Sequence, residues 1–410
     1  MNINADRLFQ RLEELNRVGS TPEGGVRRLA LSDADKGGRD LVVGWMKELD
    51  LKVEIDQIGN IFGTRGGRED VAAVMTGSHI DTVYNGGKLD GNLGVLAGLE
   101  IVRILDENNL ETNRPFTVAV FTNEEGARFQ PDMMGSLAFA GGIELETALQ
   151  TRDDQGLVLG EELARIGYAG SLPCGVNIPS AFVELHIEQG PILESEGITI
   201  GIVENLQGIS WTEISIEGQA NHAGTTPMHL RIDAGYYASL IANFVHDLAL
   251  EMGGAQVATV GVIELSPNII NVVPGSARLT VDLRNPDNVL LQEAENKLVD
   301  FLAELKSSHP IQIDTNNLVR FDPVVFDEAV IGHIEKNVTS RGYTSRRMTS
   351  GAGHDAQMMA RVCPTAMIFT PSINGVSHNP AEATNPEDLI AGAEVLLDTV
   401  LDLLDSEQVS

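Results

Sequence analysis

Cysteine, positive charge and long apolar runs are all scarce in this chain of 410 residues. Its two cysteines, Cys174 and Cys363, are too few and too far apart in sequence for a disulfide framework, which suits a reducing compartment. Lys and Arg number 28 against 59 Asp and Glu, and the formal net charge of -31 repels phosphate backbones and anionic membrane faces. We therefore expect no nucleic-acid partner.

The shortage of long apolar runs argues against a membrane-spanning protein. No segment approaches the roughly 20 apolar residues that a membrane helix needs, so we expect no membrane partner. Near the N-terminus, Leu8, Leu12 and Leu15 follow helical spacing among charged residues, which predicts an amphipathic helix and not a secretion signal. We expect a cytoplasmic protein, and its length favours about two domains.

The pattern of apolar segments predicts an α/β domain. From residue 40 to about 205, short apolar runs alternate with helical patterns, which favours a doubly wound, mostly parallel sheet. The expected elements there are helices 39–49, 92–107 and 136–150 and strands 71–76, 116–122 and 181–185. The same texture returns with helix 326–341, strand 365–370 and a last helix that starts at Asn385-Pro386, a cap followed by proline at the first helical position.

A different order separates these two stretches. It reads strand 210–218, helix 229–252, strands 256–264 and 276–284, helix 288–306 and strand 310–314. This βαββαβ order is that of a ferredoxin-like unit. In the strand 276–284 apolar residues alternate with polar ones, among them Arg284, so one face is buried. We predict a catalytic domain of residues 1–209 and 323–410, with an inserted α+β lid and dimerisation domain at 210–322.

The first segment with chemical content is GSHIDTVYNGGKLDG at 77–91, directly after the apolar run VAAVM. In open parallel sheets ligands bind beyond the carboxyl ends of the strands, which is where His79 falls. Asp81 could accept the other imidazole proton and fix the tautomer. Asp90 precedes a helix, where its simplest role is an N-cap. A histidine and aspartate of this kind are most often structural unless other strand ends carry similar residues.

The second segment, FTNEEGARF at 121–129, places Glu124 and Glu125 directly after the strand FTVAV. Adjacent carboxylates diverge, so one can bind a cation while its neighbour faces a water on that cation and acts as general base. The alternative is a solvated acidic pair on a loop.

Two further strand ends carry histidine: His186 in VELHIEQGP and His378 in SHNPAE. Nitrogen and carboxylate ligands without thiolate suit zinc, manganese, cobalt or nickel. One metal needs three or four protein ligands, so five candidates with an aspartate able to bridge predict two metals about 3.5–4 Å apart. Water on such metals would attack a carbonyl and pass its proton to Glu124. The predicted metal ligands are His79, Asp90, Glu125, His186 and His378.

Eight motifs in order resemble one family. SHIDT, LDG, NEEG, ELHIEQG, NHAGTTP, NVVPG, SGAGHDA and SHNPAE, spanning 77–382, are similar to the amidase, hydantoinase and carbamoylase branch of the dinuclear zinc aminoacylase and carboxypeptidase superfamily. The resemblance implies a zinc-peptidase-like fold with His79 and His186 on one metal. It also implies Glu125 and His378 on the other metal, with Asp90 bridging and Glu124 as base.

The resemblance also implies substrate residues and an assembly. The substrate residues are Gln189, His222, Asn271, Arg284 and the backbone of Gly353. In this family the residue matching His222 stabilises the developing oxyanion from a partner subunit's lid, and lid closure would bring Asn271 and Arg284 to the substrate carboxylate. The family and the exposed edge of a four-stranded lid sheet favour a homodimer. His354 is expected to shape the pocket.

The expected activity is metal-dependent hydrolysis of N-carbamoyl-L-amino acids, β-ureidopropionate included, to amino acid, carbon dioxide and ammonia. YNGGKLDG and FTNEEGARF resemble carbamoylases, whereas SGAGHDA resembles allantoate or ureidoglycolate amidohydrolases equally well. An aminoacylase or dipeptidase is disfavoured because peptidase relatives usually carry a carboxylate at the position of His186. A metal-loaded binding protein without turnover would lack the base that Glu124 provides.

Overall fold

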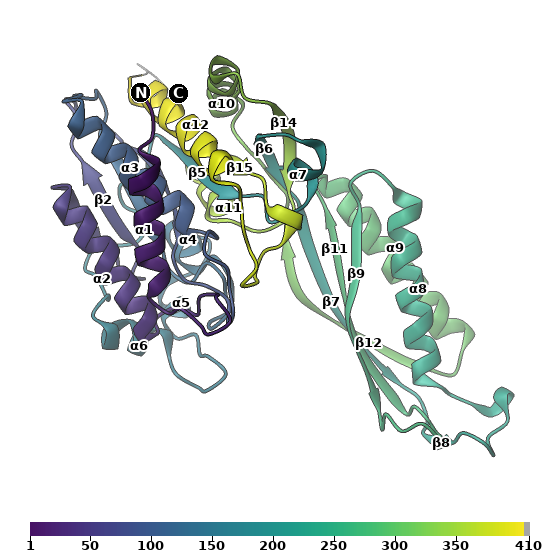
Figure 1. Ribbon diagram of the computed structural model, residues 1–410. Helices are drawn as coiled ribbons and strands as arrows, with labels where there is room; N and C mark the ends of the chain where they lie inside the picture. Colours follow the sequence, from purple (N-terminus) through teal and green to yellow (C-terminus); the bar gives the residue numbers. More distant parts are fainter. Residues whose placement is uncertain (406–410) are drawn as a thin grey trace. The chain divides into compact units, whose positions relative to one another are not determined.

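The computed structural model describes residues 1–405 (Figure 1). Its contacts divide the chain into two compact units. Unit 1 combines Met1–Glu204 with the chain from Val325 onward, and unit 2 is Asn205–Val324. Unit 2 is therefore a few residues longer at each end than the expected insertion 210–322.

Unit 1 is built on a nine-stranded sheet in the order β1-β2-β4-β3-β5-β15-β6-β13, with β14 paired to β6. Its four central strands, β4, β3, β5 and β15, are parallel, whereas β2 and β6 run antiparallel to their neighbours in that group. The expected mostly parallel sheet is thus confirmed at its centre. The strands are β1 (Lys52–Ile55), β2 (Ile61–Arg65), β3 (Val74–His79), β4 (Phe116–Phe121), β5 (Ala181–Ile187), β6 (Ile200–Leu206), β13 (Val324–Val325), β14 (Ser345–Ser350) and β15 (Thr365–Thr370).

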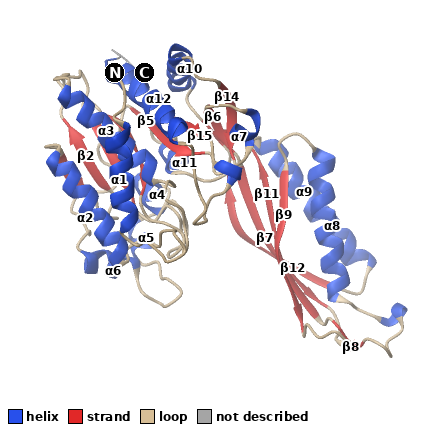
Figure 2. Ribbon diagram, in the orientation of Figure 1, coloured by secondary structure: helices blue, strands red, loops and turns tan. Residues whose placement is uncertain are grey.

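Helices surround this sheet (Figure 2). They are α1 (Ala5–Arg17), α2 (Asp33–Glu48), α3 (Asn92–Glu107), α4 (Met134–Phe139), α5 (Leu145–Leu149), α6 (Leu159–Ile166), α7 (Ile192–Glu196), α10 (Glu328–Arg341), α11 (Asp355–Met359) and α12 (Pro386–Asp405), with the 3-10 turn η2 (Ile373–Gly375). None of the helices within residues 1–405 is long and apolar enough to cross a membrane.

The helix α3 packs against β3, β4 and β5 and is buried over most of its length. Glycine makes the close approach possible, because a Cβ at Gly94 would lie 2.6 Å from the carbonyl oxygen of Leu185 in β5. The start of α3 is therefore held against the end of β5, where His186 lies.

One predicted helix is wrong. Residues 136–150 form two short helices, α4 and α5, because Gly141 adopts φ 69, a left-handed conformation that ends a helix. The predictions for α3, α12 and β15 match the observed starts at Asn92, Pro386 and Thr365.

Unit 2 confirms the βαββαβ order. Its four-stranded antiparallel sheet runs β12-β7-β11-β9, and α8 and α9 lie on one side of it (Figure 2). The elements are β7 (Gly208–Glu217), α8 (Ala234–Met252), β9 (Val257–Ser266), β11 (Ser276–Asn285), α9 (Asn288–Ser308) and β12 (Gln312–Phe321), with the short β8 (Asn221–His222), β10 (Val272–Val273) and η1 (Met228–Leu230). The helix α8 begins later than the expected 229, because Asp233 caps it by accepting from the N–H groups of Gly235 and Tyr236.

Candidate metal centre

The central strands of unit 1 bring the predicted ligands to one edge of the sheet. His79 ends β3, and Glu125 follows β4. His186 is the second-to-last residue of β5, and His378 lies in the loop after β15. Because these four strands are parallel neighbours, their carboxyl ends meet at the same edge.

Asp90 lies at the centre of this group. Its Oδ1 is 3.1 Å from His186 Nε2 and 3.5 Å from His79 Nε2. Its Oδ2 is 3.4 Å from His378 Nε2, which in turn lies 3.2 Å from Glu125 Oε2. The side chains form two ligand sets that share Asp90: His79, Asp90 and His186, and Asp90, Glu125 and His378. Each carboxylate oxygen of Asp90 faces a different set.

The two buried imidazoles are oriented by backbone carbonyls. His79 Nδ1 lies 2.9 Å from the carbonyl oxygen of Asp81, and His186 Nδ1 lies 2.9 Å from that of Ile187. Because a carbonyl only accepts, each Nδ1 carries the proton and donates it. The lone pair of a neutral ring is then on Nε2, which faces Asp90. This is the tautomer that a metal ligand requires.

Two sequence expectations about aspartates are corrected here. The Asp81 carboxylate does not take the His79 proton: its Oδ1 is 3.9 Å from Nδ1, and the carbonyl of the same residue is the acceptor. The Asp81 carboxylate instead accepts the backbone N–H groups of Glu124 (3.2 Å) and Glu125 (3.3 Å). Asp90 is not an N-cap, because Gly91 occupies the cap position of α3.

The acidic groups of this edge are close together and poorly solvated. Burial raises the pKa of Glu124 well above its usual range, with Asp355 and Glu125 adding to the effect and His79 opposing it. Burial and the nearby Asp90 raise the pKa of Glu125 to about 8. Carboxylates that resist ionisation in this way would be neutralised by bound cations, so the donor set fits divalent metals.

In contrast to the two glutamates, His378 and Asp90 have pKa values that are shifted toward their charged forms. The hydrogen bond to Asp90 raises the pKa of His378 to about 9, although partial burial opposes it. Burial also opposes ionisation of Asp90, but the Nε2–H groups that His186, His378 and His79 carry when protonated outweigh it and hold the pKa of Asp90 well below its usual range. Asp90 is therefore an anion in the protein without metals.

Glu124 lies beside the first ligand set, with Oε2 3.3 Å from His79 Nε2. Gln189 is there too: its Nε2 donates to Asp90 Oδ2 over 2.9 Å. Gly353 precedes His354, whose ring meets the His186 ring edge-on with centroids 4.4 Å apart. Among the described residues, His354 Nε2 and the Oε1 of Gln189 are buried without a hydrogen-bond partner, so the site offers polar atoms to a ligand.

In unit 2 the structure brings His222 and Asn271 together. β8 pairs with β10, so Val272 lies opposite His222, and the N–H of Ala223 donates to the carbonyl of Asn271 over 2.9 Å. Both side chains are exposed. His222 Nδ1 accepts the N–H groups of Gly224 (3.1 Å) and Thr225 (3.2 Å), so the proton of the neutral ring is on Nε2.

Arg284 lies apart from that pair. It sits near the far end of β11, opposite Ile209 and Val257, and its guanidinium binds the Asp282 carboxylate at 2.9–3.0 Å. From Ser276 to Arg284 there are eight residue steps, or roughly 27 Å along a strand. Asn271 and Arg284 of one chain therefore lie toward opposite ends of the unit 2 sheet, and their approach to one substrate carboxylate stays a prediction.

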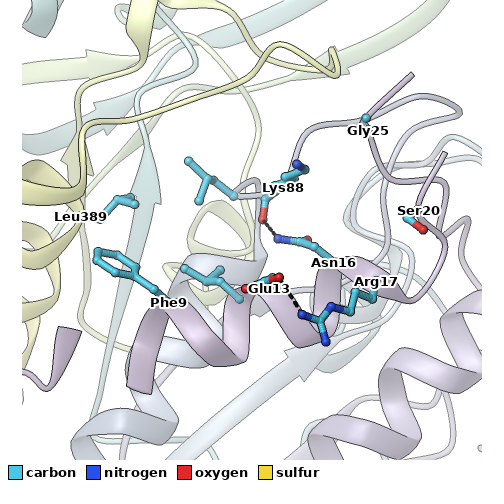
Figure 3. A pocket seen from close by; sticks show the side chains of 11 residues that line it. Phe9, Glu13, Asn16, Arg17, Ser20, Gly25, Lys88 and Leu389 are labelled. Atoms are coloured by element: carbon cyan, nitrogen blue, oxygen red, sulfur yellow. Dashed lines mark hydrogen bonds and ion pairs between the residues drawn. The ribbon is translucent and has the colours of Figure 1, made fainter. Parts of the chain in front are cut away.

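Sequence reasoning left some residues of this edge without a role. Glu382, from the SHNPAE motif, accepts the N–H groups of Leu89 and Asp90. The sequence signal that could have identified Glu382 was its position close to His378, because neither a helix cap nor a neighbouring cation explains a carboxylate there. The helix α1 also contacts the loop that carries Asp90. Asn16 Nδ2 donates to the Lys88 carbonyl over 3.0 Å, in a pocket lined by α1 (Figure 3).

Comparison with known proteins agrees with this geometry. Residues 75–402 match the peptidase family M20/M25/M40. The chain belongs to this family. It is 41% identical over 401 residues to an N-carbamoyl-L-amino-acid amidohydrolase from Rhizobium meliloti, covering 98% of this chain and 96% of that protein. A crystal structure of an amidase of the hydantoinase/carbamoylase family from Burkholderia multivorans superimposes with a TM-score of 0.94 at 45% identity, covering 98% of each chain.

A second activity occurs among the relatives. The chain is 36% identical over 387 residues to an allantoate amidohydrolase from Escherichia coli (strain K12), covering 93% of this chain and 94% of that protein. The predicted zinc-peptidase-like fold and hydantoinase/carbamoylase likeness are confirmed. The family member described here is a metal-dependent amidohydrolase that acts on C–N bonds other than peptide bonds.

Proposed function

We propose that this protein hydrolyses the ureido C–N bond of N-carbamoyl-L-amino acids and releases L-amino acid, carbon dioxide and ammonia. The observation that supports it is the pair of ligand sets sharing Asp90, with Glu124 beside them. This arrangement occurs in a chain that is similar over nearly its whole length to an N-carbamoyl-L-amino-acid amidohydrolase.

The proposed cofactors are two divalent ions, drawn from zinc, manganese, cobalt and nickel. His79 and His186 would hold one and Glu125 and His378 the other, with Asp90 between them. When bound, such ions polarise a carbonyl oxygen and lower the pKa of water. The donor atoms suit them because both buried histidines direct Nε2 at Asp90.

Glu124 is the proposed general base. Bound cations would let the Glu124 carboxylate ionise, and the burial that raises its pKa then favours keeping a proton taken from water until the leaving nitrogen needs one. Asp81 positions it, because the Asp81 carboxylate accepts the Glu124 N–H and so fixes the backbone that follows β4. If ammonia leaves first, the remaining N-carboxy amino acid loses carbon dioxide to give the amino acid. If the amino acid leaves first, the remaining carbamate decomposes to ammonia and carbon dioxide, so both routes give the same overall hydrolysis.

Substrate recognition is proposed to use groups from both units. Gln189 and the Gly353 backbone would contact the substrate at the edge of unit 1. Arg284 would exchange Asp282 for the substrate carboxylate, which suits a planar guanidinium. His222 would donate from Nε2 to the oxyanion, since Nδ1 already accepts two N–H bonds.

We also propose a homodimer. If His222 and Arg284 act on one small substrate, their separation along unit 2 requires that they come from different copies. The edge strand β9 supports pairing with a second copy, because Val257 and Ile263 are 49% and 50% exposed on it.

A cytoplasmic location is supported by the two cysteines, Cys174 and Cys363, which are both free.

The test of the substrate is ammonia release by protein reconstituted with manganese or zinc. N-carbamoyl-L-methionine, N-carbamoyl-β-alanine, allantoate and ureidoglycolate are compared, with a chelated sample as control. Turnover of a carbamoyl amino acid that is lost on chelation supports the proposal. Reaction with allantoate or ureidoglycolate alone would replace the substrate class and keep the site. That alternative is favoured by the similarity to an allantoate amidohydrolase.

A further inference from the structure

Glu382 joins the two loops that carry Asp90 and His378. Its side chain is 6% exposed, and Oε1 accepts the backbone N–H groups of Leu89 (2.9 Å) and Asp90 (3.1 Å). Its Oε2 accepts from Ser377 Oγ over 2.9 Å. Asp90 and Glu382 are 292 residues apart in sequence, so this carboxylate fixes a contact that no local element supplies.

The same contact extends to the side chain of Asp90. Ser377 Oγ lies 3.3 Å from Asp90 Oδ2, and Ser377 directly precedes His378. His378 has φ 52, a left-handed conformation that is costly for a residue other than glycine, and its side chain is 52% exposed. Its position therefore depends on neighbours such as Ser377 and not on burial.

Gly87 leaves the space that Glu382 occupies. A Cβ at Gly87 would lie 2.1 Å from both Cδ and Oε1 of Glu382, closer than any real contact. Even an alanine at Gly87 would push the carboxylate away from Leu89 and Asp90 without changing a charge. The geometry thus offers a second way to disturb the same contact.

We propose that Glu382 is a positioning residue that sets the spacing between Asp90 and His378, and with it the second ligand set. The inference rests on the ligand assignment proposed above. Groups that orient metal ligands typically contribute a factor of about 10–100 in metal affinity. Glu382 would act through hydrogen bonds and not through its charge.

If Glu382 acts through hydrogen bonds and not through its charge, substitution by glutamine and by alanine should affect metal affinity differently. In Glu382→Gln the amide oxygen can still accept from Leu89 and Asp90, while its NH₂ donates to Ser377 Oγ and leaves the hydroxyl proton for Asp90. We expect Glu382→Gln to bind metal within a few-fold of wild type. In Glu382→Ala all three bonds are lost, and we expect one of the two metals to bind about 10–100-fold more weakly.

The experiment is a titration of the metal-free proteins with Mn²⁺ or Zn²⁺ in competition with a chromophoric chelator, without substrate. Gly87→Ala should reproduce the loss seen in Glu382→Ala. The double variant Gly87→Ala/Glu382→Ala should lose no more than Glu382→Ala alone, since both changes remove one contact. If Glu382→Ala does not fold, Gly87→Ala and Glu382→Gln carry the comparison.

Glu100→Ala is the matched control. Glu100 is a buried glutamate like Glu382; it accepts the backbone N–H of Asn4 and N–H groups of Arg7, and it is hydrogen-bonded to none of the proposed ligands. It should lower the Tm of the metal-free protein and leave metal affinity unchanged. Equal losses in Glu382→Gln and Glu382→Ala would show that charge matters instead of position and overturn the inference, as would wild-type affinity in Glu382→Ala.

Wild-type metal binding is measured first, so failure of the substrate assignment leaves this test intact. A wild-type protein that binds no metal would overturn the ligand assignment and the inference together.

Discussion

The proposed functional groups are organised in opposite ways in the two units. At the edge of the unit 1 sheet, side chains from four strand ends gather around Asp90, and backbone carbonyls orient the two buried ones, His79 and His186. In unit 2, His222 and Asn271 are exposed at one end of the sheet, and Arg284 is bound to Asp282 near the other. Within the described residues, the candidate metal ligands lie together in one unit, whereas the proposed substrate groups of unit 2 do not form a site by themselves.

The largest expected effect tests whether unit 1 is catalytically complete. Glu124→Gln removes the base but keeps the side-chain volume, so kcat should fall by about 10²–10⁴-fold while metal affinity stays near wild type. Ammonia release and metal titration measure the two quantities. An active Glu124→Gln enzyme would remove Glu124 as the base.

A smaller loss is expected in unit 2. His222→Ala removes a donor to the oxyanion, so kcat should fall by about 10²–10³-fold. If His222 acts on a substrate held by another copy, mixing the two inactive variants, Glu124→Gln and His222→Ala, should restore activity. Random pairing gives half mixed dimers with one intact site each, or about a quarter of wild-type activity.

The size of the assembly controls that experiment. A size-exclusion and light-scattering measurement should give twice the chain mass. If the mixture stays inactive while subunits exchange, the substrate contacts of unit 2 act within one chain and the comparison between units loses its meaning.

The sequence predicted the edge of unit 1 because strand ends are visible as apolar runs followed by polar residues. His79, Glu125 and His186 stand directly after or within such runs, so parallel neighbours had to bring them together. The spacing along unit 2 was not visible in this way. The motifs NHAGTTP and NVVPG identified His222 and Asn271 as candidate residues. Only the pairing of β8 with β10 shows that these two are neighbours, and only the register of β11 shows that Arg284 is far from them.

The sequence also could not predict whether a residue orients its neighbours through its side chain or through its main chain. Asp81 was expected to act through its carboxylate, yet its carbonyl oxygen meets His79 and its carboxylate binds the backbone after β4. Glu382 is a similar case, because its partners at Leu89 and Asp90 depend on a contact between distant loops. Motifs identify residues, whereas the division of labour between main chain and side chain depends on the fold.

Metal binding should depend on pH in a way that only unit 1 explains. Without metals the pKa of Glu125 is about 8 and that of His378 about 9, so both groups hold protons at pH 7. A metal must displace those protons, and affinity should therefore rise with pH from 7 through about 9. Calorimetric titration at pH 7 in two buffers of different ionisation enthalpy should detect proton release. Affinity that does not change over this range would contradict the ligand roles of Glu125 and His378.

The smallest effect concerns the other end of unit 2. Arg284→Lys keeps the positive charge but loses the planar fork that can bind a carboxylate through two hydrogen bonds, so KM should rise about tenfold with little change in kcat. Metal affinity should not change, because Arg284 is not one of the proposed ligands. The decisive control is a ureido substrate without a carboxylate: with it, Arg284→Lys and wild type should have the same KM. A tenfold rise for that substrate as well would mean that the Arg284 pair with Asp282 supports the sheet of unit 2 and does not recognise the substrate.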